Sequence, residues 1–455
     1  MRSIIILLFS CIILTDCNCQ SKSIQVKKDD GPAFHEWAPG PPMGWNSWDC
    51  FGPTVKEDEV KANADYMASH LKKFGWEYIV VDIRWYVEND KAGGYNQNDP
   101  VYVIDEYGRL LPAVNRFPSS ANGKGFKPLA DYVHGKGLKF GIHVMRGIPV
   151  MAVIKNTPIY GTSIKAGDIY SAEGQCKWLR DMYTVVAGKK GAQEYYNSIM
   201  DLYASWGVDF LKIDDLSSPY HAEEIEMIRK AIDRTGRKMV LSTSPGPTPV
   251  EQAEHIKRNA NMWRTVDDLW DNWKSLKHEF DVCNLWSSKG GPGYYPDLDM
   301  LPLGKIGIRA ERGNPRSTGF TKDEQFTLMT LFAIFRSPLM FGGNLPDNDE
   351  FTLSLITNRA VLEINQRSIN NKQLFRDGDL IAWTADDPET GDKYLAFFNA
   401  SDSESSVEMS VKFEQMGLSG THSVKDLWTG KKPGEYTDVF SVPVNRHGAG
   451  LYRIK

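Results

Sequence analysis

Apolar positions along this chain follow two periods. Continuous apolar runs predict strands that are buried on both faces, and between most of them apolar residues recur every three or four positions, as in amphipathic helices. A polar or turn-forming stretch bounds most of the runs. The expected strands cover residues 41–48, 78–82, 138–145, 208–215, 239–244, 261–265, 281–286 and 338–341.

Strands that alternate with helices indicate a parallel α/β architecture. About eight such units favour a (β/α)₈ TIM barrel. A doubly wound open sheet is the alternative, but the chain lacks the Gly-rich nucleotide-binding motif that would support it. Thr321 and Glu324 form a capping box and predict the start of a helix that is apolar almost all round over residues 326–335.

The pattern changes after about residue 365. Short strand-like runs separated by turn residues predict a C-terminal antiparallel β-sandwich. We therefore expect the barrel over residues 41–360 and the sandwich over residues 361–455. Two long polar stretches, about 86–125 and 147–190, are expected to be insertions at the barrel rim that wall a pocket.

The first forty residues have the pattern of a targeting segment. A short apolar run behind a basic residue predicts a signal peptide over residues 1–19, and residues 20–40 a polar tether. A lipoprotein signal, with Cys17 as the site of a lipid anchor to a membrane, is the alternative. The expected location is secreted or periplasmic, or the cell surface if the chain is lipid-anchored.

Composition excludes several classes of function. The 455 residues are 41% hydrophobic and carry a net charge of −5, with no long basic run that would indicate a nucleic-acid partner. The cysteines outside the leader, Cys50, Cys176 and Cys283, lack metal-ligand spacing and are expected to be buried thiols, with a single disulfide bridge and one leftover thiol as the alternative. Nothing in the sequence indicates a metal site or a cofactor. The oligomeric state is left open.

Carboxylates recur where the predicted strands end. Asp214 follows the buried run 208–213, and Lys212 shares its face of the strand. At the C-terminal end of a parallel barrel, a cation beside a carboxylate keeps it ionised and available as a nucleophile. An acidic loop after an ordinary strand would explain the same residues. Other acidic strand ends are Asp82, Asp267 with Asp268, and Asp297 with Asp299.

Four motifs in chain order resemble glycoside hydrolase family 27, the α-galactosidase and α-N-acetylgalactosaminidase family. They are MGWNSW at 43–48, LKID at 211–214, WRTVDDLWDNW at 263–273 and PDLDML at 296–301. The resemblance is collinear from about residue 41 to the C-terminus. It implies a barrel followed by a β-sandwich and a retaining double displacement through a glycosyl-enzyme intermediate.

The resemblance also implies roles for individual residues. It makes Asp214 the nucleophile and Asp268 the general acid and base, with Asp267 as the rival for the second role. Burial and the charge of Asp214 would raise the pKa of Asp268 and keep it protonated for the first step. The residues expected to contact the sugar are Trp45, Asp82, His143, Lys212, Arg264 and Asp299.

Two departures from the family pattern concern the substrate. α-Galactosidases usually carry two adjacent aspartates after the second strand, which hold O4 and O6, whereas here Asp82 is followed by Ile83. The position that reads the 2-substituent, Glu in galactosidases and Ser in N-acetylgalactosaminidases, is Ser244. An exo-acting α-galactosidase acting on an oligosaccharide or polysaccharide is the first expectation. An α-N-acetylgalactosaminidase, a β-L-arabinopyranosidase, an isomaltodextran-cleaving enzyme, a non-catalytic carbohydrate-binding barrel and an NAD- or metal-dependent hydrolase remain alternatives.

Overall fold

The computed structural model describes residues 31–402 and 406–455. The expected leader at 1–19, the lipidation site at Cys17 and tether residues 20–30 lie outside the described residues. The end of the expected tether is folded: residues Ala33–Trp37 form a short 3₁₀ helix, and the backbone oxygen of Phe34 accepts a hydrogen bond from Asn261. Among the described residues, no helix is both long and apolar enough to cross a membrane.

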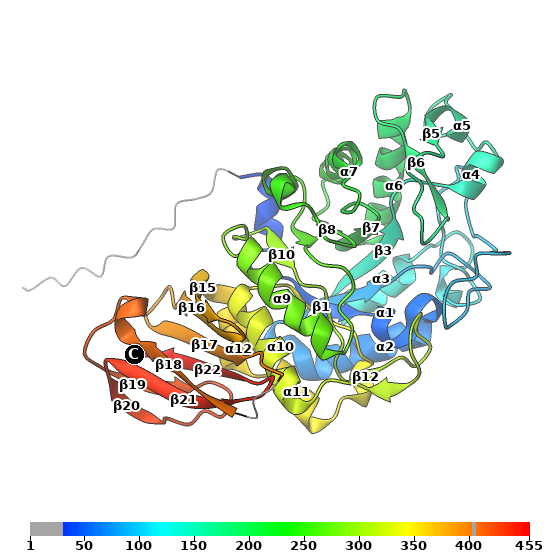
Figure 1. The fold of residues 1–455 in the computed structure, drawn as a ribbon. Coiled ribbons are helices and arrows are strands. Elements are labelled where there is room, and N and C mark those ends of the chain that lie inside the picture. Colours follow the sequence, from blue (N-terminus) through cyan, green and yellow to red (C-terminus); the bar gives the residue numbers. More distant parts are fainter. Residues whose placement is uncertain (1–30, 403–405) are drawn as a thin grey trace, which may run out of the picture. The chain divides into compact units, whose positions relative to one another are not determined.

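A nine-stranded parallel sheet forms the centre of the larger domain. Its order is β10-β9-β8-β7-β3-β2-β1-β14-β11 (Figure 1). The strands are β1 (Met43–Asn46), β2 (Tyr78–Val81), β3 (Lys139–Met145), β7 (Phe210–Asp214), β8 (Val240–Thr243), β9 (Met262–Arg264), β10 (Tyr295–Asp297), β11 (Met300–Leu301) and β14 (Leu339–Phe341).

The sheet closes into a barrel because the strands at its two ends, β10 and β11, occupy the same position in the barrel wall. Strand β10 pairs with β9 at one end of the order, and β11 pairs with β14 at the other. Only Leu298 and Asp299 separate β10 from β11 along the chain. The two terminal strands are therefore successive parts of one barrel strand, the seventh of eight, as the expected (β/α)₈ topology requires.

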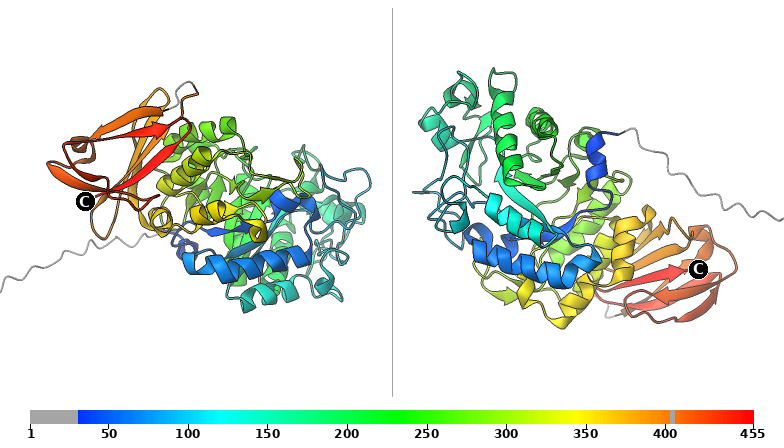
Figure 2. Two further views of the ribbon diagram at one scale, coloured as in Figure 1. Left: turned by 90° about the horizontal axis from the view of Figure 1, so that it is seen from below. Right: turned by 180° about the vertical axis from the view of Figure 1, so that it is seen from behind.

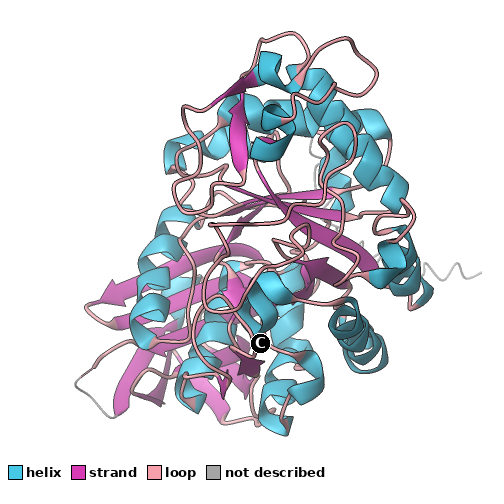
Figure 3. Cartoon of the chain, turned by 90° about the vertical axis from the view of Figure 1, so that its right-hand side faces the viewer, coloured by secondary structure: helices cyan, strands magenta, loops and turns pink. Residues whose placement is uncertain are grey.

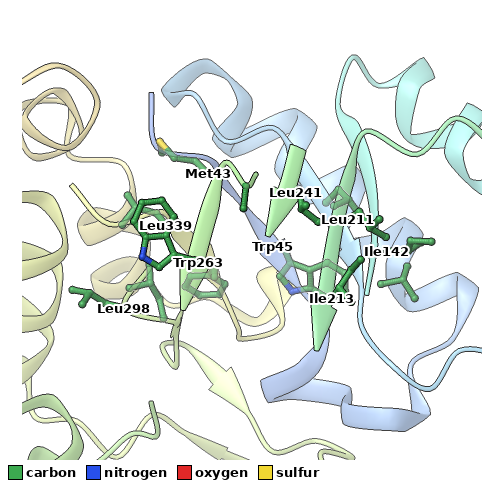
Figure 4. Close-up of a cluster of buried hydrophobic side chains, with 14 of the residues drawn as sticks. Met43, Trp45, Ile142, Leu211, Ile213, Leu241, Trp263, Leu298 and Leu339 are labelled. Carbon is green, nitrogen blue, oxygen red and sulfur yellow. The ribbon is translucent and has the colours of Figure 1, made fainter. Parts of the chain in front are cut away.

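Each strand divides its side chains between the barrel interior and the surrounding helices. Alternate residues point to opposite faces of a strand. The interior cluster includes Val80, Phe210, Val240, Met262 and Met340. Their neighbours along the strands pack outward into the main core, where Figure 4 shows them; this outer set includes Trp45, Ile142, Leu211, Ile213, Leu241, Trp263 and Leu339.

Helices surround the strands, as Figure 3 shows in cyan. They are α1 (Trp48–Phe51), α2 (Glu57–Tyr66), α3 (Lys127–Gly135), α6 (Ala192–Trp206), α7 (Ala222–Thr235), α8 (Ala253–Lys257), α9 (Trp273–Trp286), α10 (Lys322–Phe335), α11 (Glu350–Ile356) and α12 (Arg359–Arg367). The capping box of α10 is confirmed, because Thr321 Oγ1 accepts from the backbone N–H of Glu324. The strand expected at 281–286 was wrong: these residues belong to α9, because Leu276, Phe280 and Cys283 recur at helical spacing and are buried together.

The two polar stretches fold at the C-terminal ends of the strands. The second contains β4 (Ile148–Pro149), α4 (Val150–Ile154), α5 (Ala166–Ile169), β5 (Tyr170–Ser171) and β6 (Met182–Val185). The first stretch is tied to it by Arg84, whose guanidinium bridges Asp90 and Asp181 at 2.9 and 2.8 Å. Both insertions are thus held to the end of β2.

The last part of the chain forms antiparallel sheets, which Figure 2 shows from two sides in orange and red. The six-stranded sheet has the order β15-β16-β17-β22-β19-β20, and β18 pairs with β21. A separate apolar core that includes Phe397, Met409 and Phe440 fills the sandwich. Its strands are β15 (Ile369–Asp377), β16 (Leu380–Asp386), β17 (Lys393–Asn399), β18 (Ser406–Lys412), β19 (Thr421–Asp426), β20 (Gly434–Thr437), β21 (Val439–Asn445) and β22 (Ala449–Ile454).

Two further expectations concern the domain boundary and the cysteines. The expected boundary between residues 360 and 361 falls within α12, and the antiparallel strands begin at Ile369. Cys50, Cys176 and Cys283 are buried free thiols, as expected. The folded body is therefore held together by packing rather than by disulfide bonds among these residues.

Candidate active site

Strand β7 delivers two charged side chains to the barrel mouth. Lys212 and Asp214 share the inward face with Phe210, while Leu211 and Ile213 pack outward. Asp214 is the last residue of the strand and is buried. The next residue, Asp215, has a positive φ of 64° and turns the chain away. The period-two pattern of the strand therefore places a cation and a carboxylate side by side.

A histidine from β3 joins two carboxylates. His143 lies opposite Lys212 in the register of β3 and β7. Its Nδ1 donates to Asp82 Oδ1 at 2.5 Å, and its Nε2 lies 3.0 Å from Asp214 Oδ1. Lys212 Nζ lies 3.7 Å from the other oxygen of Asp82. Neighbouring strands thus build a continuous chain of alternating charges.

This chain of charges sets the protonation of its members. Burial acts to raise the pKa of Asp214, but His143 and Lys212 outweigh burial and hold that pKa well below its ordinary value. The pKa of Asp82 is lowered in the same way, against burial, by His143 and Lys212. Burial acts to lower the pKa of His143, but Asp214 and Asp82 raise it above its ordinary value. The site holds Asp214 as an anion, which is the state that a nucleophile needs.

A second set of charged residues comes from β9, from the loop after it and from the junction between β10 and β11. Arg264 Nη1 lies 2.5 Å from Asp299 Oδ1, and its Nη2 donates to Asp268 Oδ1 at 3.2 Å. The backbone N–H of Leu269 donates to Asp299 Oδ2 at 2.8 Å, which fixes the loop after β9. Burial raises the pKa of Asp299 to about 7, against the opposing charge of Arg264 and with the support of Asp268.

Both sets of charged residues line one cavity of about 430 Å³. Of the eight residues expected at the site, seven line this cavity: Asp82, His143, Lys212, Asp214, Arg264, Asp268 and Asp299. Asp267 also lines it, and its Oδ1 accepts a hydrogen bond from the backbone N–H of Asp268. Both residues are exposed, so the expected burial of Asp268 was wrong. The tertiary structure therefore brings the two carboxylates expected to be catalytic, Asp214 and Asp268, to one pocket.

Trp45 is the exception, and the expectation that it contacts the sugar was wrong. Its side chain is fully buried, does not line the cavity, and donates from Nε1 to the backbone oxygen of Gly343 at 2.8 Å. Trp45 pairs with Ile79 on the outward face of β1, so it packs among the outer core residues in Figure 4. Trp48, three residues later, lines the cavity instead.

Sequence reasoning missed the aromatic wall of the pocket. Trp48 stacks on Tyr95 at 5.9 Å between ring centroids, and Tyr95 lies 6.1 Å from Trp178. Tyr95 and Trp178 come from the two rim insertions, whose position at the pocket was expected but whose individual residues were not. Ile83 and Ser244, where the chain departs from the family pattern, also line the cavity.

The described residues contain no cluster of three or more His, Cys, Asp or Glu side chains arranged to hold a metal ion. The cavity is lined by carboxylates, an imidazole, three cationic side chains (Lys212, Arg264 and Arg312) and aromatic faces. A buried anion and a second, more exposed carboxyl in one pocket can perform nucleophilic displacement with proton transfer. Sugars are bound by this kind of surface, in which charged hydrogen-bonding groups adjoin aromatic rings.

Comparisons with known proteins agree with this chemistry. The family model described as Alpha galactosidase A matches residues 40–182 and 179–367, and the model of the α-galactosidase C-terminal β-sandwich domain matches residues 377–454. Alpha-galactosidase 2 of Arabidopsis thaliana is 28% identical over 91% of this chain and 89% of its own length. Alpha-N-acetylgalactosaminidase of Gallus gallus is 25% identical over 90% of this chain and 92% of its own length.

A solved structure is more similar in sequence than either of these relatives. It is a variant of a family 27 β-L-arabinopyranosidase from Geobacillus stearothermophilus, in complex with arabinose. That protein is 51% identical, with a TM-score of 0.91, over 93% of this chain and 99% of its own. Taken with the two family models, these matches show that the chain belongs to glycoside hydrolase family 27, the α-galactosidase family, and is a glycoside hydrolase.

Proposed function

We propose that this enzyme is an exo-acting, retaining β-L-arabinopyranosidase. The observation that carries the proposal is Ile83, which directly follows Asp82 and lines the cavity with its side chain almost fully buried. α-Galactosidases usually have a second aspartate at this position to hold O6 of galactose. An isoleucine offers no hydrogen bond to that hydroxyl, and leaving a buried hydroxyl unpaired costs about 1–3 kcal/mol.

β-L-Arabinopyranose fits such a pocket by its chemistry. Its ring has the hydroxyl configuration of α-galactose at C2, C3 and C4, but a hydrogen replaces the hydroxymethyl group on C5. Asp82 and Lys212 can still bind the hydroxyls that both sugars share, whereas Ile83 would face a carbon without a polar substituent. The 51% identity to the Geobacillus stearothermophilus enzyme supports the same substrate.

α-Galactosidase activity is the second candidate. It is supported by the family model that matches residues 40–367 and by curated relatives such as the Arabidopsis thaliana enzyme at 28% identity. An α-N-acetylgalactosaminidase would use Ser244, which lines the cavity and helps to hold the pKa of Asp214 low. Each of these sugars makes a different demand on the same pocket, so kinetics can separate them.

The proposed mechanism is a double displacement. Asp214, held as an anion by His143 and Lys212, attacks the anomeric carbon while Asp268 protonates the leaving oxygen. Asp268 then takes a proton from water, which attacks the glycosyl-enzyme and releases the sugar with its anomeric configuration retained. The side chain of Asp268 is 39% exposed and that of Asp214 only 9%. Asp268 can therefore exchange protons with water, while Asp214 is shielded from it.

The test is a panel of p-nitrophenyl glycosides with β-L-arabinopyranosyl, α-galactosyl, α-N-acetylgalactosaminyl and α-glucosyl groups. We expect kcat/KM to be at least about tenfold higher for the arabinopyranoside than for the galactoside. A higher value for the galactoside would reject the proposed substrate. The Asp214→Gly variant is the control: if it kept full activity, or if the wild type hydrolysed no glycoside while still binding sugar, the catalytic proposal would fail.

A further inference from the structure

Asp49 lines the same cavity but has no part in the chemistry described so far. It is the second residue of the short helix α1, directly after Trp48, and its exposed fraction is 4%. Its side chain lies against Gly342 at the end of β14, where any side chain in place of glycine would collide with its carboxyl group. The first and last strands of the barrel therefore hold this carboxyl at the pocket wall.

One oxygen of the Asp49 carboxyl group is unpaired within the described part of the protein. Among the described residues, its buried Oδ2 has no hydrogen-bond partner. Asp82, Asp214 and Asp299 differ, because each lies within ion-pair distance of His143, Lys212 or Arg264. A buried polar atom without a partner costs about 1–3 kcal/mol, and a hydroxyl of a molecule bound in the cavity would supply the missing partner.

Burial and the neighbouring charges favour the protonated form of Asp49. Burial is the main cause that raises the pKa of Asp49 well above its ordinary value, and the negative charges of Asp299, Asp268 and Asp82 add to it. Lys212 acts in the opposite direction and is outweighed. A protonated carboxyl presents an O–H donor and a carbonyl acceptor, which together match the donor and acceptor capacity of a sugar hydroxyl.

We propose that Asp49 is a further substrate-binding residue, whose carboxyl group forms a hydrogen bond with a ring hydroxyl of the sugar in this cavity. The inference rests on the proposed function only in that the bound molecule is a glycoside. It holds equally for an arabinopyranoside and a galactoside, because these share three ring hydroxyls. A purely structural role, in which Asp49 only fills the space beside Gly342, is the competing explanation.

The experiment is a double-mutant cycle in which one side chain of the enzyme and one hydroxyl of the substrate are removed separately and together. The variants are Asp49→Ala and Asp49→Asn, and the substrates are the p-nitrophenyl glycoside that the wild type hydrolyses best and its 2-, 3- and 4-deoxy analogues. We expect Asp49→Ala to lower kcat/KM about tenfold to a hundredfold on the parent glycoside. On the one analogue that lacks the partner hydroxyl, wild type and variant should be nearly equal. Asp49→Asn keeps a donor and an acceptor and should recover most of the loss.

The deoxy series separates binding from structure. If Asp49→Ala lowers kcat/KM by the same factor on the parent and on all three analogues, or leaves it unchanged, the proposal is overturned. If Asp49→Ala does not fold, the series is measured with Asp49→Asn, and a change that is uniform over all four substrates again overturns it. Because the parent is whichever glycoside is cleaved best, a galactoside preference would reject the proposed substrate and leave this test intact.

Discussion

His143 Nε2 lies 3.0 Å from Asp214 Oδ1, while Nδ1 of the same ring donates to Asp82. The three residues come from β7, β3 and the end of β2, which are neighbours in the barrel. One imidazole thus connects the proposed nucleophile to a proposed sugar ligand. A protonated ring can donate to both carboxylates at once, whereas a neutral ring can donate to only one.

The stability that His143 contributes should depend on pH. Its pKa is raised by Asp214 and Asp82 against burial, so its contribution is fully present below about pH 6.5 and is lost as pH rises through the higher folded-state pKa. Thermal unfolding of wild type and His143→Gln between pH 5 and 9 measures this. We expect a gap in unfolding free energy of about 1.5–3 kcal/mol at the acid end that narrows toward the alkaline end. A gap that stays constant over this range would contradict it.

Removal of the proposed nucleophile should abolish turnover and preserve the pocket. We expect Asp214→Gly to lower kcat by at least roughly a thousandfold, because no other carboxylate can attack from its position. Azide should restore part of the rate by occupying the vacated space and attacking the anomeric carbon, and the product should be a glycosyl azide of inverted configuration. Product analysis by NMR decides the matter; an azide product with retained configuration would assign the nucleophile elsewhere.

A carboxylate at position 83 should shift the substrate preference. Ile83→Asp places a hydrogen-bond acceptor beside Asp82, where the hydroxymethyl group of galactose would lie. We expect the ratio of kcat/KM for galactoside over arabinopyranoside to rise about tenfold to a hundredfold. Ile83→Val, which keeps an apolar side chain, is the matched control and should leave the ratio within a few-fold. No change in ratio with Ile83→Asp would mean that this residue does not face C5 of the sugar.

The two tryptophans of the first motif should differ in effect. Trp48→Ala removes a ring from the cavity wall, so we expect KM to rise with little loss of stability. Trp45→Phe removes the hydrogen bond to Gly343 from a fully buried site, so we expect a loss of about 1–3 kcal/mol in unfolding free energy with KM nearly unchanged. Kinetics and chemical denaturation of both variants measure these effects. A rise in KM for Trp45→Phe together with an unchanged KM for Trp48→Ala would contradict the prediction.

The buried ion pair between Arg84 and Asp181, which holds the rim insertions, should contribute to the free energy of unfolding. Asp181 accepts from Arg84, Tyr86 and Tyr102, all within the protein interior or its margin. Asp181→Ala leaves the buried guanidinium with Asp90 as its remaining ion-pair partner, and we expect a loss of about 3–5 kcal/mol. Asp99→Ala, an exposed position in the first insertion, should change stability by less than about 0.5 kcal/mol. Equal effects of the two variants in denaturant titrations would contradict the role of the pair.

The sequence alone determined most of the elements and the order of the charged groups along them. Lys212 and Asp214 stand two apart at the end of an apolar run, and this local period is enough to place them on one strand face. It also indicated that Arg264, Asp268 and Asp299 follow later strands of a barrel. These are short-range properties, because a strand needs only its own residues to define alternate faces.

Only the tertiary structure decided which face looks inward and which distant residues meet there. Trp45 and Trp48 are alike in the sequence, but pairing of β1 with β2 and β14 turns the first outward, and the chain after the strand brings the second to the cavity. Asp49 gains its place from Gly342, nearly three hundred residues later, and the pocket wall gains Tyr95 and Trp178 from two separate insertions. The helix at 273–286 was mistaken in part for a strand for a different reason, because the helical spacing of Leu276, Phe280 and Cys283 was overlooked. The phase of a pattern, unlike its period, is set by long-range contacts that form only when the barrel closes.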